Sequence, residues 1–389
     1  MGDMLLVNQV QWNEREINNV LDVFTKNWFA SGHYVTQFQK ALGDKFGGRF
    51  FLTNSGSTAL ETAVMTLMKF GKVKPGDYVL HPALTFNTSA SCFAKFGMVP
   101  VFVDAAPGTY NMDIKQAEEA IEQFDINLVV IPYILGNTTD ISKLRELAWK
   151  RNIPIIGDSC DTLGTEWNSR EMGNWADMTA YSFYGSHHIT TAGVGGALRV
   201  NNEVAEETIK SLIYWGRDWE AEQTFANRYA YATLGSDYQM TEIQAAFGLA
   251  QLSRLDEYND RRRTVFNAML SAFLQNDLQT YFVMPLSHPS CNPSWFGFPL
   301  TISYYVPFSR DQFISKLLLK NIECRPMFSG NTVKQKAWKF TNALHPFPLP
   351  VADRALTHSF FLPAWAMPDD ALHYLIESVV GVVKELTNG

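Results

Sequence analysis

The pattern of apolar and polar positions changes along the chain. From about residue 50 to 215, short apolar runs alternate with stretches whose apolar positions recur at helical spacing. We predict helices over Thr58–Phe70, Ile114–Phe124 and Ile141–Arg151. We predict strands over Phe50–Leu52, Tyr78–His81, Pro100–Val103, Asn127–Pro132, Pro154–Gly157 and Met178–Ser182. The run Leu128–Leu135 is apolar on both faces, as in a strand covered by helices on each side. This alternation predicts a doubly wound α/β sheet that binds ligands at the carboxyl ends of its strands.

The remainder of the chain has a different rhythm. Apolar residues at helical spacing predict one long helix over Met240–Leu270. Beyond it, the pattern predicts a strand over Trp295–Ile302 and a helix near Arg310–Leu319. We therefore predict two domains, a large one over residues 1–262 and a smaller α+β domain over residues 263–389.

Composition excludes several classes of protein. Of the 389 residues, 46% are hydrophobic and 18% charged, which is enough to bury a substantial core and excludes wholesale disorder. The net charge of −7 gives no electrostatic footprint for nucleic acid. No apolar run approaches about 18 residues, so we predict no membrane span. The four cysteines lie far apart without zinc-site spacing, which favours a reduced, cytoplasmic protein with no metal site.

Asn54–Thr58 follows a predicted strand and opens a predicted helix. Small residues such as Gly56 and Ser57 let backbone N–H groups approach an anion, and the helix N-terminus adds a favourable dipole. The same residue types also serve as plain helix caps, which is the better-supported interpretation of this segment alone.

Asp158 ends an apolar strand, where a doubly wound sheet places its ligand crevice. A buried carboxylate there would suit a protonated ring nitrogen, because it stabilises a nearby cation. A helix cap or a structural ion pair explains an isolated aspartate equally well.

The order of these motifs is more specific than any one of them. Thr85-Phe86 follows a strand, and Ser182–Thr191 (SFYGSHHITT) leads into Gly195-Gly196. Together with the phosphate-cradle candidate and Asp158, they resemble the DegT/DnrJ/EryC1/StrS family of fold-type I pyridoxal phosphate (PLP) enzymes. These enzymes act on nucleotide-linked sugars, and the resemblance covers most of the chain, continuing through Leu234–Leu252. It implies an aspartate-aminotransferase-like fold, with a mixed, mostly parallel sheet between helices and a smaller C-terminal α+β domain.

His187 stands where that family has its Schiff-base lysine, and no lysine lies between Lys150 and Lys210. An imidazole cannot replace a primary amine there, but it can act as a general acid and base. A histidine at this position is typical of the sugar 3-dehydratase branch. The sequence is similar to GDP-4-keto-6-deoxymannose 3-dehydratase and CDP-4-keto-6-deoxyglucose 3-dehydrase, notably in Pro293–Pro299 and Ile322–Asn331. The alternative for His187 is a satisfied core histidine.

The resemblance implies a role for each cofactor-binding position. Gly56, Ser57 and Ser182 would hold the phosphate of the cofactor, which is PLP or its amine form, PMP. Phe86 would stack on the pyridine ring, Asp158 would pair with its nitrogen, and Asp161 would lie beside them. His187 would move protons at the cofactor's reactive carbon. Asp237 stands where the family has a phosphate-contacting asparagine from the neighbouring subunit, which puts its local pose in doubt because a carboxylate repels phosphate.

Three further residues are candidates for contacts with substrate. Arg325 would suit a substrate phosphate or a carboxylate, because its planar fork matches both, although a surface salt bridge is an equal alternative. His188 and Asn331 are the others, with packing the better interpretation of His188. The family's GEGG loop is altered here to Gly193–Gly196 (GVGG).

These residues lead to one functional hypothesis with two alternatives. The resemblance implies removal of the 3-hydroxyl of a nucleotide-linked 4-keto-6-deoxyhexose in dideoxysugar biosynthesis, with PMP regenerated from L-glutamate. It also implies a homodimer, because Gly235–Met240 reaches the partner's cofactor in that family. The related iron–sulfur enzymes use four cysteines, of which only Cys160 is matched, so we predict no cluster. The alternatives are a sugar aminotransferase that lost its lysine and a non-catalytic nucleotide-sugar-binding homologue.

Overall fold

A seven-stranded sheet forms the centre of the computed structural model, which describes residues 4–201, 205–222 and 224–388. In spatial order its strands are β1 (Arg49–Thr53), β9 (Gly196–Val200), β8 (Met178–Ser182), β5 (Ile155–Asp158), β4 (Ile126–Pro132), β2 (Tyr78–Pro82) and β3 (Val99–Val103). Only β9 pairs antiparallel to its neighbours; the other strands all run the same way. The mixed, mostly parallel sheet predicted from the sequence is therefore confirmed.

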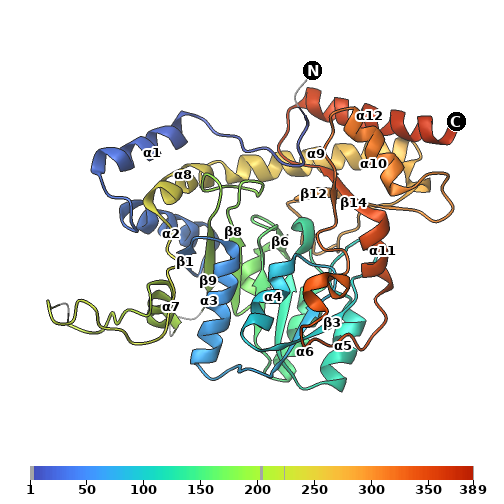
Figure 1. Cartoon of the computed structure of the whole chain (residues 1–389). Coiled ribbons are helices and arrows are strands. Elements are labelled where there is room, and N and C mark those ends of the chain that lie inside the picture. The colour runs from blue at the N-terminus through green and yellow to red at the C-terminus, as the bar shows by residue number, and fades with distance from the viewer. Residues whose placement is uncertain (1–3, 202–204, 223, 389) are drawn as a thin grey trace.

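Helices cover both faces of this sheet (Figure 1). Those of the first part of the chain are α1 (Glu14–Lys26), α2 (His33–Phe46), α3 (Gly56–Lys69), α4 (Asn87–Lys95), α5 (Ile114–Gln123), α6 (Ile141–Lys150), α7 (Glu206–Ile213) and α8 (Glu242–Leu252). Alternate residues of β4 show how the faces divide. Leu128 and Val130 pack with α3, α4 and α7, whereas Val129 and Ile131 pack with α5 and α6. Burial on both faces explains the continuous apolar run seen in the sequence.

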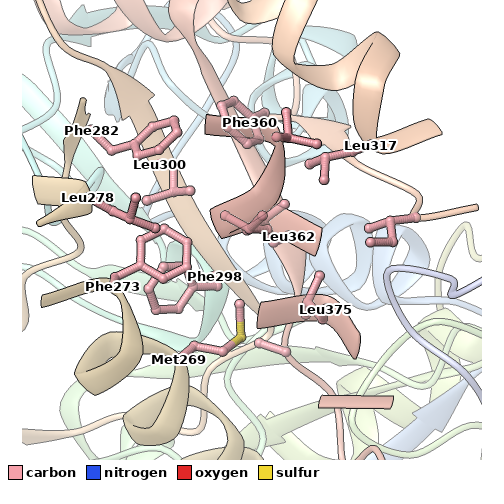
Figure 2. Packing of buried hydrophobic residues seen from close by; sticks show 14 of the residues in the cluster. Met269, Phe273, Leu278, Phe282, Phe298, Leu300, Leu317, Phe360, Leu362 and Leu375 are labelled. Carbon is pink, nitrogen blue, oxygen red and sulfur yellow. The ribbon is translucent and has the colours of Figure 1, made fainter. Parts of the chain in front are cut away.

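The C-terminal part builds a second core around an antiparallel sheet. Its strands lie in the order β10 (Phe282–Val283), β12 (Gly297–Ile302), β14 (Ser359–Pro363) and β13 (Arg325–Pro326). Its helices are α9 (Leu255–Gln275), α10 (Arg310–Leu319), α11 (Pro350–His358) and α12 (Asp369–Asn388). Phenylalanine and leucine side chains from α9, β10, β12 and β14 fill the space between them (Figure 2). The predicted strand and helix at β12 and α10 are confirmed.

The predicted domain boundary after residue 262 falls inside α9, and the buried C-terminal core begins at Val265 on the same helix. A third, small sheet joins β11 (Cys291–Asn292) to β6 (Glu166–Trp167) and β7 (Arg170–Glu171). The two parts thus share both a helix and a sheet, and their division at residue 262 stays a prediction.

The single long helix predicted over Met240–Leu270 is wrong. The chain forms α8 and α9, separated by Ser253 and Arg254, whose amides bond to carbonyls three residues earlier in a tighter turn. The first turn of α9 still packs with α8, α1 and α2 through Leu255 and Tyr258, whereas its later part, from Val265, enters the C-terminal core. No glycine or proline marks the break, so the apolar periodicity could not show it.

Two further segments lie outside the helices and sheets described above. The N-terminal strap, which we define as residues 5–11, pairs with Ile322 through Leu5 and bonds through Gln11 to the carbonyl of Ala366. The segment between α7 and α8 extends outward at the lower left of Figure 1. We call its described residues, 214–222 and 224–241, the arm. Bridges Tyr214–Asp237 and Arg217–Tyr231 fold it back on itself. In the described ranges, no helix has both the length and the apolar character needed to cross a bilayer.

Candidate active site

A cavity of about 1020 Å³ opens where the parallel strands of the large sheet end. One wall comes from segments that follow β1, β2, β5 and β8. The other comes from the C-terminal part, through residues such as Phe296, Phe328 and Lys336. The predicted site residues that line it are Gly56, Ser57, Phe86, Asp158, Asp161, Ser182, His187 and Arg325. The structure therefore gathers residues spread over most of the sequence at one edge of the sheet.

The N-terminus of α3 forms one end of this cavity. Ser55 caps the helix by accepting the Thr58 N–H at 3.2 Å, so the capping interpretation holds for Ser55. Gly56 and Ser57 follow it and line the cavity. A Cβ at Gly56 would lie 2.8 Å from Cys160 Sγ and 2.9 Å from Ser182 Cβ, so a glycine is needed for this close approach. The helix N-terminus, with hydroxyls nearby, is suited to bind a phosphate.

Asp158 lies at the carboxyl end of β5 and is buried. Its Oδ2 accepts a hydrogen bond from Ser89 Oγ at 2.5 Å, and its Oδ1 accepts one from the Cys160 N–H at 3.2 Å. Both donors are uncharged, so these bonds leave the charge of the carboxylate without a cation. A protonated pyridine nitrogen would supply that cation, and the exposed ring of Phe86 lines the same cavity. The residues present therefore fit a PLP or PMP cofactor.

Asp161 and His187 form a close pair, with 3.6 Å between Asp161 Oδ1 and His187 Nδ1. Burial raises the pKa of Asp161 to about 8, and the charge of Asp158 adds to this. Burial lowers the pKa of His187 to about 3, and the charge of Arg262 contributes. Both shifts favour the uncharged forms, a protonated carboxyl group on Asp161 and an unprotonated imidazole on His187.

The surroundings of His187 differ from those of a satisfied core histidine. Its ring lies between Phe296, at 5.3 Å between centroids, and Tyr184, at 5.9 Å. Its Nδ1 has no hydrogen-bond partner, although the residue lines the cavity. A buried polar atom without a partner costs free energy and favours contact with an incoming polar group.

Three predicted residues lie outside the cavity wall. His188 is buried behind it, and its Nε2 lies 2.8 Å from the carbonyl oxygen of Ser294. Asn331 donates to Asp353 at 2.7 Å and caps a short helix, which occupies its amide. Asp237 is exposed at the base of the arm, where its carboxylate accepts from Gln239. Arg325 does line the cavity but also forms the surface ion pair with Glu323, at 2.9 Å.

Sequence reasoning missed several residues around the cavity. Lys336 is the one primary amine among the described lining residues, and it belongs to a segment without a recognisable motif. Phe296 lies within a stretch shared with the resembled branch, so that stretch was its only signal. Val194 and Gly195 place the altered loop at the cavity wall. Across the described residues, no group of three His, Cys, Asp or Glu side chains could hold a metal ion.

Comparison with known proteins gives consistent findings. Residues 10–380 match the model of the DegT/DnrJ/EryC1/StrS aminotransferase family. The lipopolysaccharide biosynthesis protein RfbH of Salmonella typhimurium is 30% identical over 93% of this chain and 88% of its own length. The dTDP-4-dehydro-2,6-dideoxy-D-glucose 3-dehydratase of Saccharopolyspora spinosa is 29% identical, over 92% and 81%.

A solved structure of GDP-4-keto-6-deoxymannose-3-dehydratase, in which PLP and glutamate are trapped, superposes with a TM-score of 0.89. The superposition covers 96% of this chain and 99% of that one, at 23% identity. The predicted fold-type I, aminotransferase-like architecture is thereby confirmed.

Proposed function

The chain belongs to the DegT/DnrJ/EryC1/StrS aminotransferase family of PLP-dependent, sugar-modifying enzymes, and on this premise we propose that it dehydrates a nucleotide-linked 4-keto-6-deoxyhexose at C3. One observation carries the proposal. His187, which cannot anchor PLP as a lysine does, lines the cavity, and its buried Nδ1 has no hydrogen-bond partner. A base without an amine suits proton transfer better than amino-group transfer.

Each residue of the wall then has a defined task. The N-terminus of α3, with Ser57 and Ser182, binds the cofactor phosphate, and Asp158 holds the proton of the ring nitrogen. When bound, PMP supplies a primary amine and a ring that accepts electrons. His187 takes a proton at the reactive carbon and delivers one to the departing 3-hydroxyl. Its low pKa serves the second task, because a weakly basic imidazole gives up its proton readily.

We propose that L-glutamate, not a reductase, regenerates PMP. Trapping of PLP with glutamate in the similar 3-dehydratase structure supports this donor. The cysteines support a cluster-free enzyme, since Cys160 lies at the cavity whereas Cys291 and Cys324 pack in two separate cores. We also propose a cytoplasmic enzyme of deoxysugar biosynthesis, with all four cysteines as free thiols. The relative named for lipopolysaccharide biosynthesis supports lipopolysaccharide as the destination of the sugar.

A nucleotide-sugar aminotransferase is the second candidate, because Lys336 offers a primary amine within the cavity. Mass analysis of products separates the candidates. The protein is incubated with PLP, L-glutamate and GDP-, CDP- or dTDP-linked 4-keto-6-deoxysugars. We expect a 4-keto-3,6-dideoxy sugar from at least one substrate. An amino sugar instead would establish the aminotransferase, and an unchanged substrate that still binds would establish a binding protein.

We expect PLP to bind without a covalent link to the chain. Borohydride treatment of the PLP-loaded protein should leave no pyridoxyl group on any peptide, because His187 stands where the anchoring amine would be. The Lys336→Gln variant is the control for the lysine within the cavity. A stable pyridoxyl group that disappears in this variant would show that Lys336 anchors the cofactor, against our proposal.

We expect a homodimer in which the arm contacts the partner. Phe225 and Leu234 of the arm are 94% and 93% exposed, an unfavourable arrangement in a free monomer. Twofold assembly is also the commonest oligomeric state. Sedimentation should therefore give the mass of a dimer, and Leu234→Asp should shift it toward the monomer. A wild-type monomer with full activity at all concentrations would contradict this expectation.

A further inference from the structure

Three consecutive arginines on α9 have three different environments. Arg261 forms an ion pair with Asp369 at 2.5 Å near the surface. Arg263 bonds to Asp260 and to the carbonyl of Gly164. Arg262 points inward and is only 3% exposed, and burial lowers its pKa to about 9. Burying a cation costs free energy, so the groups that Arg262 contacts indicate the role for which it is buried.

The hydrogen bonds of Arg262 all go to uncharged acceptors near His187. One guanidinium nitrogen donates to the carbonyl oxygens of Trp295, at 3.2 Å, and Phe296, at 3.5 Å. The ring of Phe296, which lines the large cavity, lies 5.3 Å from the His187 ring, centroid to centroid. These hydrogen bonds thus fix the backbone that carries Phe296, one of the side chains against which the imidazole packs.

A second set of hydrogen bonds connects Arg262 to His187 through the N-terminal strap. The other guanidinium nitrogen donates to Asn8 Oδ1 at 3.2 Å. Asn8 Nδ2 in turn donates to the carbonyl oxygens of Ser186 and, at 3.2 Å, His187. A small cavity of about 20 Å³ is lined by Arg262, Asn8, His187 and His188, so His187 borders both this cavity and the large one.

We propose that Arg262 is the positioning residue of His187, holding its backbone through Asn8 and its ring through the Trp295–Phe296 carbonyls. The catalytic consequence rests on the proposed dehydratase function, but the positioning itself does not. A displacement of about 1 Å in a reacting group can cost roughly 10²-fold in rate, so this support bears directly on proton transfer.

The charge of Arg262 has a second effect on the same imidazole. Charged and titratable groups that line the two cavities with His187 come from several elements: Asp158 at the end of β5, Cys160 and Asp161 after it, Tyr184 and His188 on its own segment, Tyr258 and Arg262 on α9, and Arg325 and Lys336 across the large cavity. Arg262 lowers the pKa of both histidines, after burial, the main cause. It therefore helps to keep the His187 imidazole unprotonated near neutral pH.

The test compares four variants of the full chain with wild type. Histidine-labelled apoprotein is titrated by NMR, with the His187 signal assigned from its absence in His187→Asn. Arg262→Met should raise the His187 pKa, whereas Arg262→Lys, which keeps the charge, should hold it low. Asn8→Ala should leave the pKa low but slow dehydration by roughly tenfold to 10²-fold through misplacement. Arg261→Met, on the same helix, should change neither quantity.

The outcomes separate cleanly. A folded Arg262→Met protein with unaltered His187 pKa and dehydration rate would overturn the proposal, as would an equal change in Arg261→Met. If Arg262→Met does not fold, Asn8→Ala decides, and an unchanged rate there overturns positioning. If the wild-type protein dehydrates no sugar, the NMR titration still tests the effect of Arg262 on the His187 pKa. A change in the His187 chemical shift in Asn8→Ala then tests the positioning. The positioning proposal and the proposed function can therefore fail independently.

Discussion

Replacing His187 with asparagine is expected to slow dehydration by roughly 10²–10⁴-fold, the usual contribution of a positioned acid–base group. Asparagine cannot accept and release a proton near neutral pH. Cofactor binding should persist, because Asp158, Phe86 and the N-terminus of α3 are unchanged. Cofactor content from absorption spectra and product formation by mass analysis measure the two effects separately.

Two further variants sharpen this experiment. His187→Lys restores a primary amine, so PLP should become covalently attached and some amino-group transfer should replace dehydration. His188→Asn is the matched comparison, since His188 lies behind the wall and bonds to Ser294. It should lower thermal stability more than rate. Near-normal dehydration by His187→Asn would move the catalytic role elsewhere, with His188 the first suspect, and loss of cofactor binding would make His187 structural.

Replacing Asp158 with asparagine is expected to weaken cofactor retention, and with it dehydration, by roughly 10²- to 4 × 10³-fold. The carboxylate is buried at the end of β5 and bonds only to uncharged donors in the described structure. Removing one partner of a buried ion pair costs about 3–5 kcal/mol. At about 1.4 kcal/mol per tenfold, this gives the stated range. Titration of apoprotein with PMP, followed by absorbance, measures it.

The same variant has a readout that needs no cofactor. After burial, the charge of Asp158 is the next cause of the raised pKa of Asp161, so Asp158→Asn should lower that pKa from about 8. Infrared titration of the carboxyl groups follows the change. Asp177→Asn is the control, because Asp177 bonds to Ile155 at the opposite end of β5. If Asp158→Asn binds PMP as tightly as wild type, the ring nitrogen is held by another group.

Strand ends were the most predictable part of the site. Short apolar runs followed by small or acidic residues located Gly56, Asp158 and Ser182, since the ends of parallel strands must meet at one edge. Strand β9 was not predicted, because Arg199 interrupts its apolar pattern. That arginine is 1% exposed and bonds to the carbonyl of Gly47 and to Asn174, contacts that exist only in the folded chain.

The opposite wall of the cavity was less predictable for a related reason. Arg325 was a candidate from a shared motif, but Phe328 and Lys336 reach the cavity through packing of the C-terminal part on the sheet, which no local pattern encodes. Asn331 belongs to the same motif, yet its amide turns toward Asp353. The support of His187 by Asn8 and Arg262 joins residues more than 70 positions away, so only the structure could reveal it.

The N-terminal strap has a consequence for the order in which the protein matures. Val7 bonds to Glu323, 316 residues later, and Gln11 bonds to Ala366, 355 residues later. A nascent chain therefore cannot complete the bonds of this segment until its C-terminal part has left the ribosome. Asn8 of this segment bonds to the backbone of His187, so a product truncated before Glu323 would keep that bond but lack the strap's anchors to the C-terminal part. Completion of the chain thus anchors both ends of the strap whose middle residue, Asn8, supports His187.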